Sequence, residues 1–348
     1  MDRLTGMRLS RPVVVTLAVG LAVLLAAAAA LILARRGDGR PPLSRLVIAA
    51  GPAGQVHHIV AGAYADAARR RWGLTVEVLA TAGGVENVRL VAEGRADIGF
   101  AAVDVALNAT QGDAPFAQAL PIVGLARLYD DYVQIVVAAD SPIRRPADLA
   151  GRRVASGGVE SGSDIVASRL LVAAGVESPP VQWRQMSIVE SAAALRAGRI
   201  DAFVASGGLP TPAIADLAAT FPIRVLPLGD EVTDLEDQHG EYYLDRSIPA
   251  GTYGGRGEVA TLGIPNVIVV RRSMPDEVAY RLTELLFTER TRLAAAHEEA
   301  RRLDPRSAPV MFPPVVLHEG AARYYRSAKP MAAPMVQNAR RAESGLPR

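Results

Sequence analysis

Two segments of this chain share one pattern, and that pattern constrains the fold more than any other feature of the sequence. Val88–Asp104 reads VRLVAEGRADIGFAAVD, and Ser191–Gly208 reads SAAALRAGRIDAFVASGG. In each segment an amphipathic helical stretch ends at a glycine, an Arg-x-Asp turn follows, and a short apolar run predicts a strand. A helix–turn–strand unit that recurs in this way predicts two lobes of related topology.

Helical and strand patterns alternate along most of the chain. Apolar runs such as RLVIAA and RRVASG lead into helical stretches near Ile59–Arg71 and Asp164–Ala174. This alternation predicts an α/β protein with largely parallel sheets. Ligands of open α/β sheets bind beyond the carboxyl ends of the strands, so two such lobes that face each other would form a binding cleft.

Four loops rich in glycine and hydroxyl side chains follow predicted strands. They are GPAGQ (51–55), TAGGVEN (81–87), SGGVESGSD (156–164) and ASGGLPTP (205–212). The first three lead into helical stretches, so their backbone N–H groups could converge on a compact anionic or zwitterionic ligand. An ordinary turn or helix cap would explain any one of these loops equally well. Their recurrence in both predicted lobes favours a shared cleft.

The motifs of common catalytic, nucleotide and metal sites are missing from the sequence. The first glycine loop fits neither G-x-G-x-x-G nor a P-loop, and neither G-x-S-x-G nor H-E-x-x-H occurs. The absence of cysteine excludes disulfides, thiolate metal sites and a cysteine nucleophile. We expect Asp97 and Asp201 to tie their turns rather than act as an acid/base pair. The sequence therefore predicts a binding protein, not an enzyme, without cofactor or metal.

The formal net charge of +2, with scattered arginines, argues against a nucleic-acid partner. An uncharged apolar stretch spans Pro12–Ala34 and has basic residues on both sides. A membrane-spanning helix needs about 20 such residues, whereas a secretory signal peptide has an apolar stretch of about 7–15. We therefore favour a transmembrane anchor after a short basic segment (1–11) and before a linker (35–44). The alanines at 26–30 leave a cleaved signal as the alternative. Both interpretations place the remainder on the periplasmic or extracytoplasmic side of the membrane.

Four longer motifs occur in order along the globular part: TAGGVENVRLVAEGRADIGFAAVDVA, GRIDAFVASGGLPTPAIADLA, IPAGTYGGRGEVATLGIPNVIVV and LHEGAARYYR. Together they resemble segments of the TAXI-type solute-binding proteins of tripartite ATP-independent periplasmic (TRAP) transporters. The resemblance runs from about Leu46 to Arg326. One departure is Glu319, which stands where the family has proline in its closing segment.

The resemblance implies a two-lobed α/β fold of the type II periplasmic-binding-protein class, which the N-terminal transmembrane helix would precede. Residues 45–135 and 262–326 would form lobe 1, and residues 136–261 would form lobe 2 and the crossover. We expect the short, polar and basic segment 327–348 to be a disordered tail.

The resemblance also implies a set of ligand-binding residues. Those matched by position are Thr81, Asn87, Asp104, Ser161, Gly162, Ser163, Asp164, Gly207, Pro210 and Tyr253. Ser161 and Ser163 could bind a carboxylate and Asp104 an ammonium, although Asp104 and Asn87 could equally cap or brace turns. In the first glycine loop we add Gly54, Gln55 and His57, where the family usually has Gly-Thr-Tyr-Tyr. This departure leaves the ligand unidentified.

The implied function is that of an extracytoplasmic receptor that captures a small organic acid or amino acid between two lobes. Its partners would be TRAP-type permease subunits and, through the N-terminal helix, the membrane. A membrane-anchored ligand sensor with the same fold is an alternative. Another is an enzyme on a two-lobed α/β scaffold, because fold by itself does not determine function.

Overall fold

The computed structural model describes residues 41–159, 161–176 and 180–328. The segment expected to be a membrane anchor, residues 12–34, lies outside the described residues, as do residues 329–348 of the expected tail. Among the described residues, no helix is long and apolar enough to cross a membrane.

The strands in the described part of the chain pair into one ten-stranded sheet. Their bounds are β1 (Arg45–Ala49), β2 (Thr75–Leu79), β3 (Ile98–Ala102), β4 (Ile122–Ala138), β5 (Arg153–Gly157), β6 (Gln182–Gln185), β7 (Ala202–Gly207), β8 (Ile223–Val225), β9 (Leu244–Ile248) and β10 (Val259–Arg271). The order across the sheet is β2-β1-β3-β10-β4-β7-β5-β6, with β8 paired to β4 and β9 to β10.

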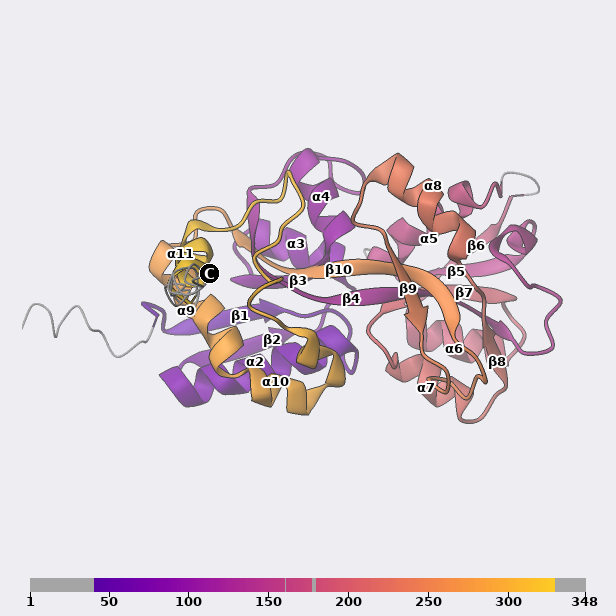
Figure 1. The fold of residues 1–348 in the computed structure, drawn as a ribbon, viewed down its shortest axis with the longest axis horizontal. Coiled ribbons are helices and arrows are strands. Elements are labelled where there is room, and N and C mark those ends of the chain that lie inside the picture. Colours follow the sequence, from indigo (N-terminus) through magenta and orange to yellow (C-terminus); the bar gives the residue numbers. More distant parts are fainter. Residues whose placement is uncertain (1–40, 160, 177–179, 329–348) are drawn as a thin grey trace, which may run out of the picture. The chain divides into compact units, whose positions relative to one another are not determined.

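The sheet is mixed rather than largely parallel. β1 runs parallel to β2 and β3, and β5 runs parallel to β6 and β7, as the helix–strand alternation predicts. The long strands β4 and β10 run antiparallel to each other and to their neighbours β7 and β3. Figure 1 shows these two strands passing through both halves of the sheet. The expectation of largely parallel sheets was wrong for the centre of the sheet. There β4 and β10 are antiparallel, and they join the two halves without the helical crossover that a parallel pair needs.

Tyr132 marks the point where β4 changes partners. It pairs with Gly263 of β10 on one side and with Gly207 of β7 on the other. We call β2, β1, β3 and the adjoining parts of β10 and β4 the first half-sheet. The second half-sheet consists of β4 from Tyr132 onward, β7, β5 and β6.

Helices cover both faces of the sheet (Figure 1). Their bounds are α2 (Val56–Trp72), α3 (Gly84–Ala92), α4 (Val103–Gln111), α5 (Gly162–Ala173), α6 (Ile188–Arg196), α7 (Pro212–Ala218), α8 (Gly229–His239), α9 (Asp276–Thr288), α10 (Arg290–Ala296) and α11 (Glu319–Ala328), with 3₁₀ turns η1 (Pro146–Leu149) and η2 (Glu298–Arg302). α11 extends to Ala328, so the first two residues of the expected tail (327–348) are helical.

Helix α2 shows how the sequence builds one of these layers. Val56, Val60, Tyr64 and Ala68 are buried and recur every four residues, so they form one apolar face against the sheet. The helix ends at Gly73, whose φ of 64° is the left-handed conformation that glycine adopts without steric cost. Its first turn, by contrast, has no side-chain cap.

The internal repeat is present in the structure. Gly94 and Gly198 follow α3 and α6 with φ values of 75° and 64°. The Asp97 carboxylate accepts a hydrogen bond from the Val47 N–H at 2.8 Å, and the Asp97 N–H donates to the Val47 carbonyl at 2.9 Å. Asp201 makes the same two bonds with Arg153, both at 2.8 Å. The two aspartates tie equivalent turns, as expected from the sequence.

Substitution of Asp97 by Ala should destabilise the fold by about 1–3 kcal/mol, because the N–H of the buried Val47 would lose its partner. Chemical denaturation of the full-length protein in detergent measures this loss. Asp140→Ala, at an exposed turn beyond β4, is the control and should change the stability little. Equal stabilities of the two variants would contradict the bracing role of Asp97.

A candidate ligand-binding cleft

A cavity of about 490 Å³ lies where the two half-sheets meet. Small-molecule sites occupy about 300–1,000 Å³, so this volume suits a compact solute. All four glycine- and hydroxyl-rich loops contribute to its wall. The cavity thus occupies the place predicted from the sequence, beyond the carboxyl ends of parallel strands from both halves.

Four helices begin at the cavity. The first residues of α2, α3, α5 and α6 line it, namely Val56, Gly84, Gly162 and Ile188. The first N–H groups of a helix have no partner within the helix and carry partial positive charge. α2 and α3 also have no side-chain cap, so these groups remain available for an anionic group of a ligand.

The described part of the wall contains no Lys or Arg. Its only acidic side chains are those of Asp131 and Glu190, and Glu190 is committed to the cap of α6, where it accepts from the Ser187 N–H at 2.8 Å and from the Ser187 hydroxyl at 2.7 Å. Donors for an anionic group in the described wall therefore come from the backbone and from hydroxyls rather than from a cationic side chain.

The structure brings seven of the thirteen predicted site residues to the cavity. These are Gln55, His57, Thr81, Ser161, Gly162, Ser163 and Gly207. The other six do not line it: Gly54, Asn87, Asp104, Asp164, Pro210 and Tyr253.

Two of those six residues brace the wall from behind. The Asn87 side chain is fully buried, donates to the Phe100 carbonyl at 2.7 Å and accepts from the Thr81 hydroxyl at 2.5 Å. The Tyr253 hydroxyl accepts from the Thr211 N–H at 2.9 Å. Thr81 and Thr211 both line the cavity, so Asn87 and Tyr253 are placed to position wall residues rather than to contact a solute.

Asp104 is buried at the start of α4, away from the cavity wall. Its carboxylate accepts from the Val105 N–H at 2.8 Å and from the Tyr243 hydroxyl at 3.4 Å. Burial raises the pKa of Asp104, although the nearby Arg169 opposes that shift. This location does not suit the expected role of Asp104 in receiving a ligand ammonium.

The remaining three belong to the glycine- and hydroxyl-rich loops but do not line the cavity themselves. Asp164 accepts hydrogen bonds from the Ser156 hydroxyl and, at 3.3 Å, from the Gln185 amide. Pro210 lines a second cavity, near η2, and Gly54 lies exposed in the turn before α2. Each therefore shapes a loop of the cleft without facing its interior.

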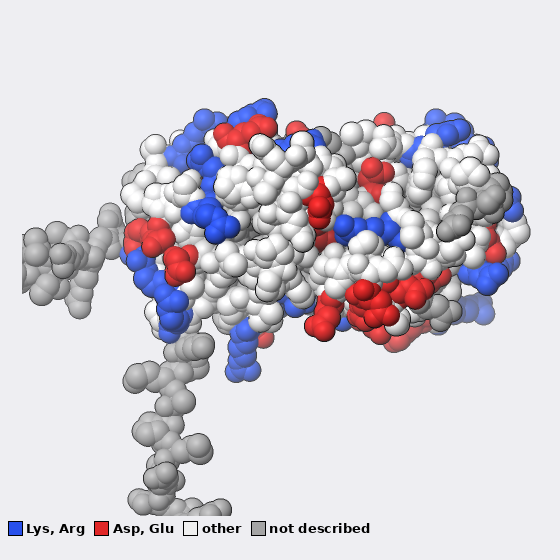
Figure 2. Space-filling model, turned by 90° about the horizontal axis from the view of Figure 1, so that it is seen from above, with Lys and Arg blue, Asp and Glu red and all other residues white. Residues whose placement is uncertain are grey.

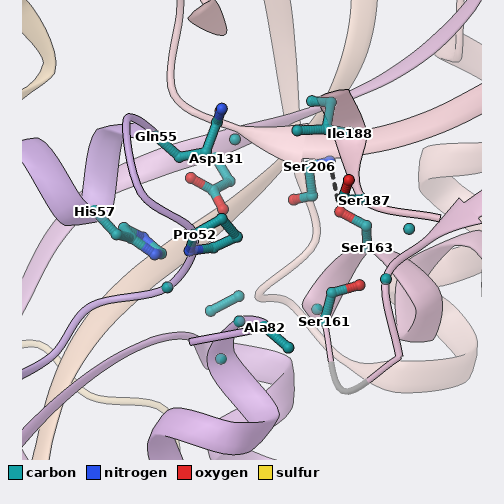
Figure 3. A pocket seen from close by; sticks show the side chains of 18 of the residues that line it. Pro52, Gln55, His57, Ala82, Asp131, Ser161, Ser163, Ser187, Ile188 and Ser206 are labelled. Atoms are coloured by element: carbon teal, nitrogen blue, oxygen red, sulfur yellow. Dashed lines mark hydrogen bonds between the residues drawn. The ribbon is translucent and has the colours of Figure 1, made fainter. Parts of the chain in front are cut away.

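Two serines at the start of α5 line the cavity. The Ser163 hydroxyl accepts from the Ser206 N–H at 3.0 Å (Figure 3), and the Ser161 hydroxyl accepts from the Asp164 N–H at 3.4 Å as the cap of α5. Gly157, with φ of 108°, allows this packing, since a Cβ there would lie 2.6 Å from the Ser161 oxygen. Because each hydroxyl uses its lone pairs for the backbone, its proton is free to donate to a solute.

His57 lies at the start of α2 and is held by Asn266 of β10. Its Nε2 is 2.9 Å from the Asn266 Oδ1, and its ring packs near Phe100 and Tyr129. Burial lowers the pKa of His57 to about 4, while the bond to Asn266 opposes this in part. The imidazole is therefore neutral at pH 7, with Nε2–H as the donor to Asn266.

Sequence reasoning missed several wall residues, above all Asp131 of β4, which lines the cavity together with Ser206 and Thr211 of the fourth loop. Asp131 is only 6% exposed, and burial raises its pKa to about 7. Its neighbour Asp130 is instead paired with Arg127 and Arg246. The available signal was two adjacent acids, Asp130 and Asp131, in the middle of an apolar strand. Successive strand residues face opposite sides, so two such acids have different surroundings.

The depressed pKa of His57 predicts a pH effect on stability. Its folded-state pKa of about 4 lies below its unfolded value near 6.5, so this histidine favours folding fully above pH 6.5. The contribution should fall as the pH drops from about 6.5 toward 4, with a loss of about 2 kcal/mol between pH 7 and pH 5. Denaturation of wild type and His57→Gln at pH 7 and pH 5 measures the difference. If both proteins lose the same stability between these pH values, His57 is not buried in its neutral form.

Comparisons with known proteins agree with this architecture. The model of the NMT1-like family matches residues 48–328, more than half of the chain. The periplasmic binding protein BugD is 16% identical, with 75% of this chain and 87% of BugD covered and a TM-score of 0.50. The alkanesulfonate-binding protein SsuA from Xanthomonas axonopodis pv. citri is 17% identical, with 82% and 84% covered and a TM-score of 0.46. The likeness to BugD shows the fold of a periplasmic binding protein, and the family match shows that the chain belongs to the NMT1-like family.

Proposed function

We propose that this protein is an extracytoplasmic solute-binding receptor that captures a small carboxylate or amino acid and delivers it to a membrane permease. The observation that carries the proposal is the cavity between the half-sheets, where four helix N-termini and the serine hydroxyls of α5 converge. Backbone N–H groups and hydroxyls can bind a carboxylate without the desolvation cost of a buried cationic side chain. The fold and the family membership support a binding role.

A division into two lobes supports a mechanism in which the lobes close around the solute. Residues 45–135 with 262–326 would form one lobe, and residues 136–261 the other. β4 and β10 are the long strands that both would share, so small changes near Tyr132 and Gly263 could bring the walls together. Each lobe would then supply part of the contacts, and a solute would favour the closed form.

The TAXI-type resemblance supports a TRAP permease as the partner. On the described part of the face in Figure 2, Lys and Arg lie in small separate groups, and Asp and Glu form one larger patch at the lower right and smaller groups elsewhere. That face therefore offers no continuous basic surface of the kind that nucleic-acid binding uses. A small solute and membrane subunits remain the proposed partners.

Catalysis is supported less well than binding. In the described part of the cleft, His57 is bonded to Asn266 and the Ser163 hydroxyl to a backbone N–H, so neither belongs to a serine–histidine pair. A nucleophilic mechanism needs such a base next to the hydroxyl. A ligand sensor with the same site remains the second candidate, and genetic adjacency to a large permease would favour transport.

Ser163→Ala should weaken solute binding by about tenfold to a hundredfold, because a polar group of the solute would lose its partner in a closed cleft. A screen of organic acids, amino acids, sugars and nucleotides by thermal shift identifies the solute, since a ligand at 100 times its Kd adds about 2.7 kcal/mol. Calorimetry on the full-length protein in detergent then compares the variants.

Ser168→Ala is the matched control, because Ser168 lies on the exposed side of the same helix, α5. It should leave affinity unchanged. Binding of sugars or nucleotides in place of carboxylates would refute the proposed solute class. Unchanged affinity of Ser163→Ala would remove this serine from the site.

The proposed anchor makes a separate prediction. If residues 12–34 stay on the mature protein, alkaline washing should leave it in the membrane pellet, because an apolar helix of that length spans the bilayer. Mass spectrometry of the mature protein should then recover the N-terminal peptide. A mature N-terminus after Ala30 would instead show a cleaved signal.

A further inference from the structure

Asp131 occupies the point where the two half-sheets meet. It directly precedes Tyr132, the residue through which β4 pairs with both β10 and β7. Adjacent strand residues face opposite sides, so Asp130 and Asp131 have different surroundings. Asp130 binds Arg127 at 2.9 Å and Arg246 at 2.6 Å. Figure 3 shows the Asp131 carboxylate in the cavity, between His57 and the serine side chains around Ser163.

The Asp131 carboxylate has no cationic partner among the described residues that line the cavity. Its Oδ1 is buried and has no hydrogen-bond partner among the described residues, although the side chain is only 6% exposed. The same holds for the buried Ser206 Oγ and Asn266 Nδ2 atoms. Both of these neutral side chains act on Asp131 as weak hydrogen-bond donors and lower its pKa, in opposition to the larger effect of burial. The group that Asp131 lacks is therefore a cation rather than a neutral donor.

A buried carboxylate without a cationic partner is costly unless its charge is neutralised. No described wall residue is a Lys or Arg, and His57 is neutral and committed to Asn266. The other ionisable groups that act on Asp131 are Asp104 and Asp130, and both raise its pKa further. The protein therefore supplies no cation to this carboxylate from within the described wall.

We infer that Asp131 recognises a cationic nitrogen of the solute, so that the receptor selects amino acids over carboxylates without an amine. This inference rests on the proposed function. The solute ammonium would lie against Asp131 and Ser206, and the solute carboxylate would lie at the helix N-termini across the cavity. An ammonium has three donors and no acceptor, so it can satisfy both the Asp131 Oδ1 and the Ser206 hydroxyl.

The same geometry disfavours dicarboxylates. A second carboxylate next to an ionised Asp131 would place two like charges in a site of low dielectric, which opposes binding. A monocarboxylate with an apolar group at this position would leave the Asp131 carboxylate buried and unpaired. Both kinds of solute lack a cationic group, and the described wall residues do not supply one either.

The test compares amino acids with matched acids that lack the amine: L-aspartate with succinate, L-glutamate with glutarate, L-alanine with propionate, and L-leucine with 4-methylpentanoate. Calorimetry uses the full-length protein in detergent at pH 7.5. We expect the best amino acid to bind at least about a hundredfold more tightly than its matched acid. This comparison uses only the wild-type protein, so its outcome does not depend on whether a variant folds.

Asp131→Asn should weaken amino-acid binding by at least about a hundredfold and reduce the preference for the amine to less than about tenfold. Its melting temperature without ligand should stay equal or rise, because a buried unpaired charge is removed. Asp140→Asn makes the same change at an exposed turn and should alter neither value.

Tight binding of a matched acid, with no preference for its amino acid, would overturn the inference and leave the proposed receptor function in place. An amine preference that survives in Asp131→Asn would also overturn it. If wild type binds none of the eight compounds and no other small carboxylate, the proposed solute class fails, and this inference fails with it.

Discussion

The antiparallel pairing of β4 with β10 is the constraint on which the rest of this structure depends. β4 has 17 residues, and its two ends belong to different half-sheets because Tyr132 pairs with β10 on one side and β7 on the other. The parallel strands on either side then point their carboxyl ends toward a common space. The cavity, the helix N-termini around it and the buried Asp131 all follow from this one pair of strands.

Polarity in the cavity comes mainly from the backbone. Uncapped N-termini of α2 and α3 and the glycine loops supply donors, while the described wall includes no cationic side chain. Backbone dipoles are fixed by the fold, so they need little reorganisation when a ligand arrives. A cationic side chain in the same place would need a partner of its own, whereas the acidic Asp131 has no cationic partner in the described wall.

A second layer of side chains holds this wall in place. Asn87 positions Thr81, Tyr253 positions the Thr211 backbone, and Asn266 holds His57. These bonds link residues far apart in the chain, and Asn87 and Asn266 are fully buried. Their substitution would disturb the wall without removing a direct contact to the solute, so binding data alone would not separate the two layers.

The sequence by itself determined the α/β class, the repeated helix–glycine–Arg-x-Asp–strand unit and the four loops around the cleft. These features depend on local rules: left-handed glycines at Gly94 and Gly198, helix periodicity, and aspartates that brace adjacent strands. Which side chains face the cavity was decided only by the tertiary structure. Asp104 lies just after β3 and Asp131 lies within β4, yet Asp104 is enclosed with Tyr243 and Asp131 lines the cleft. That difference arises because the long antiparallel strands set the register between distant segments, and no local pattern encodes that register.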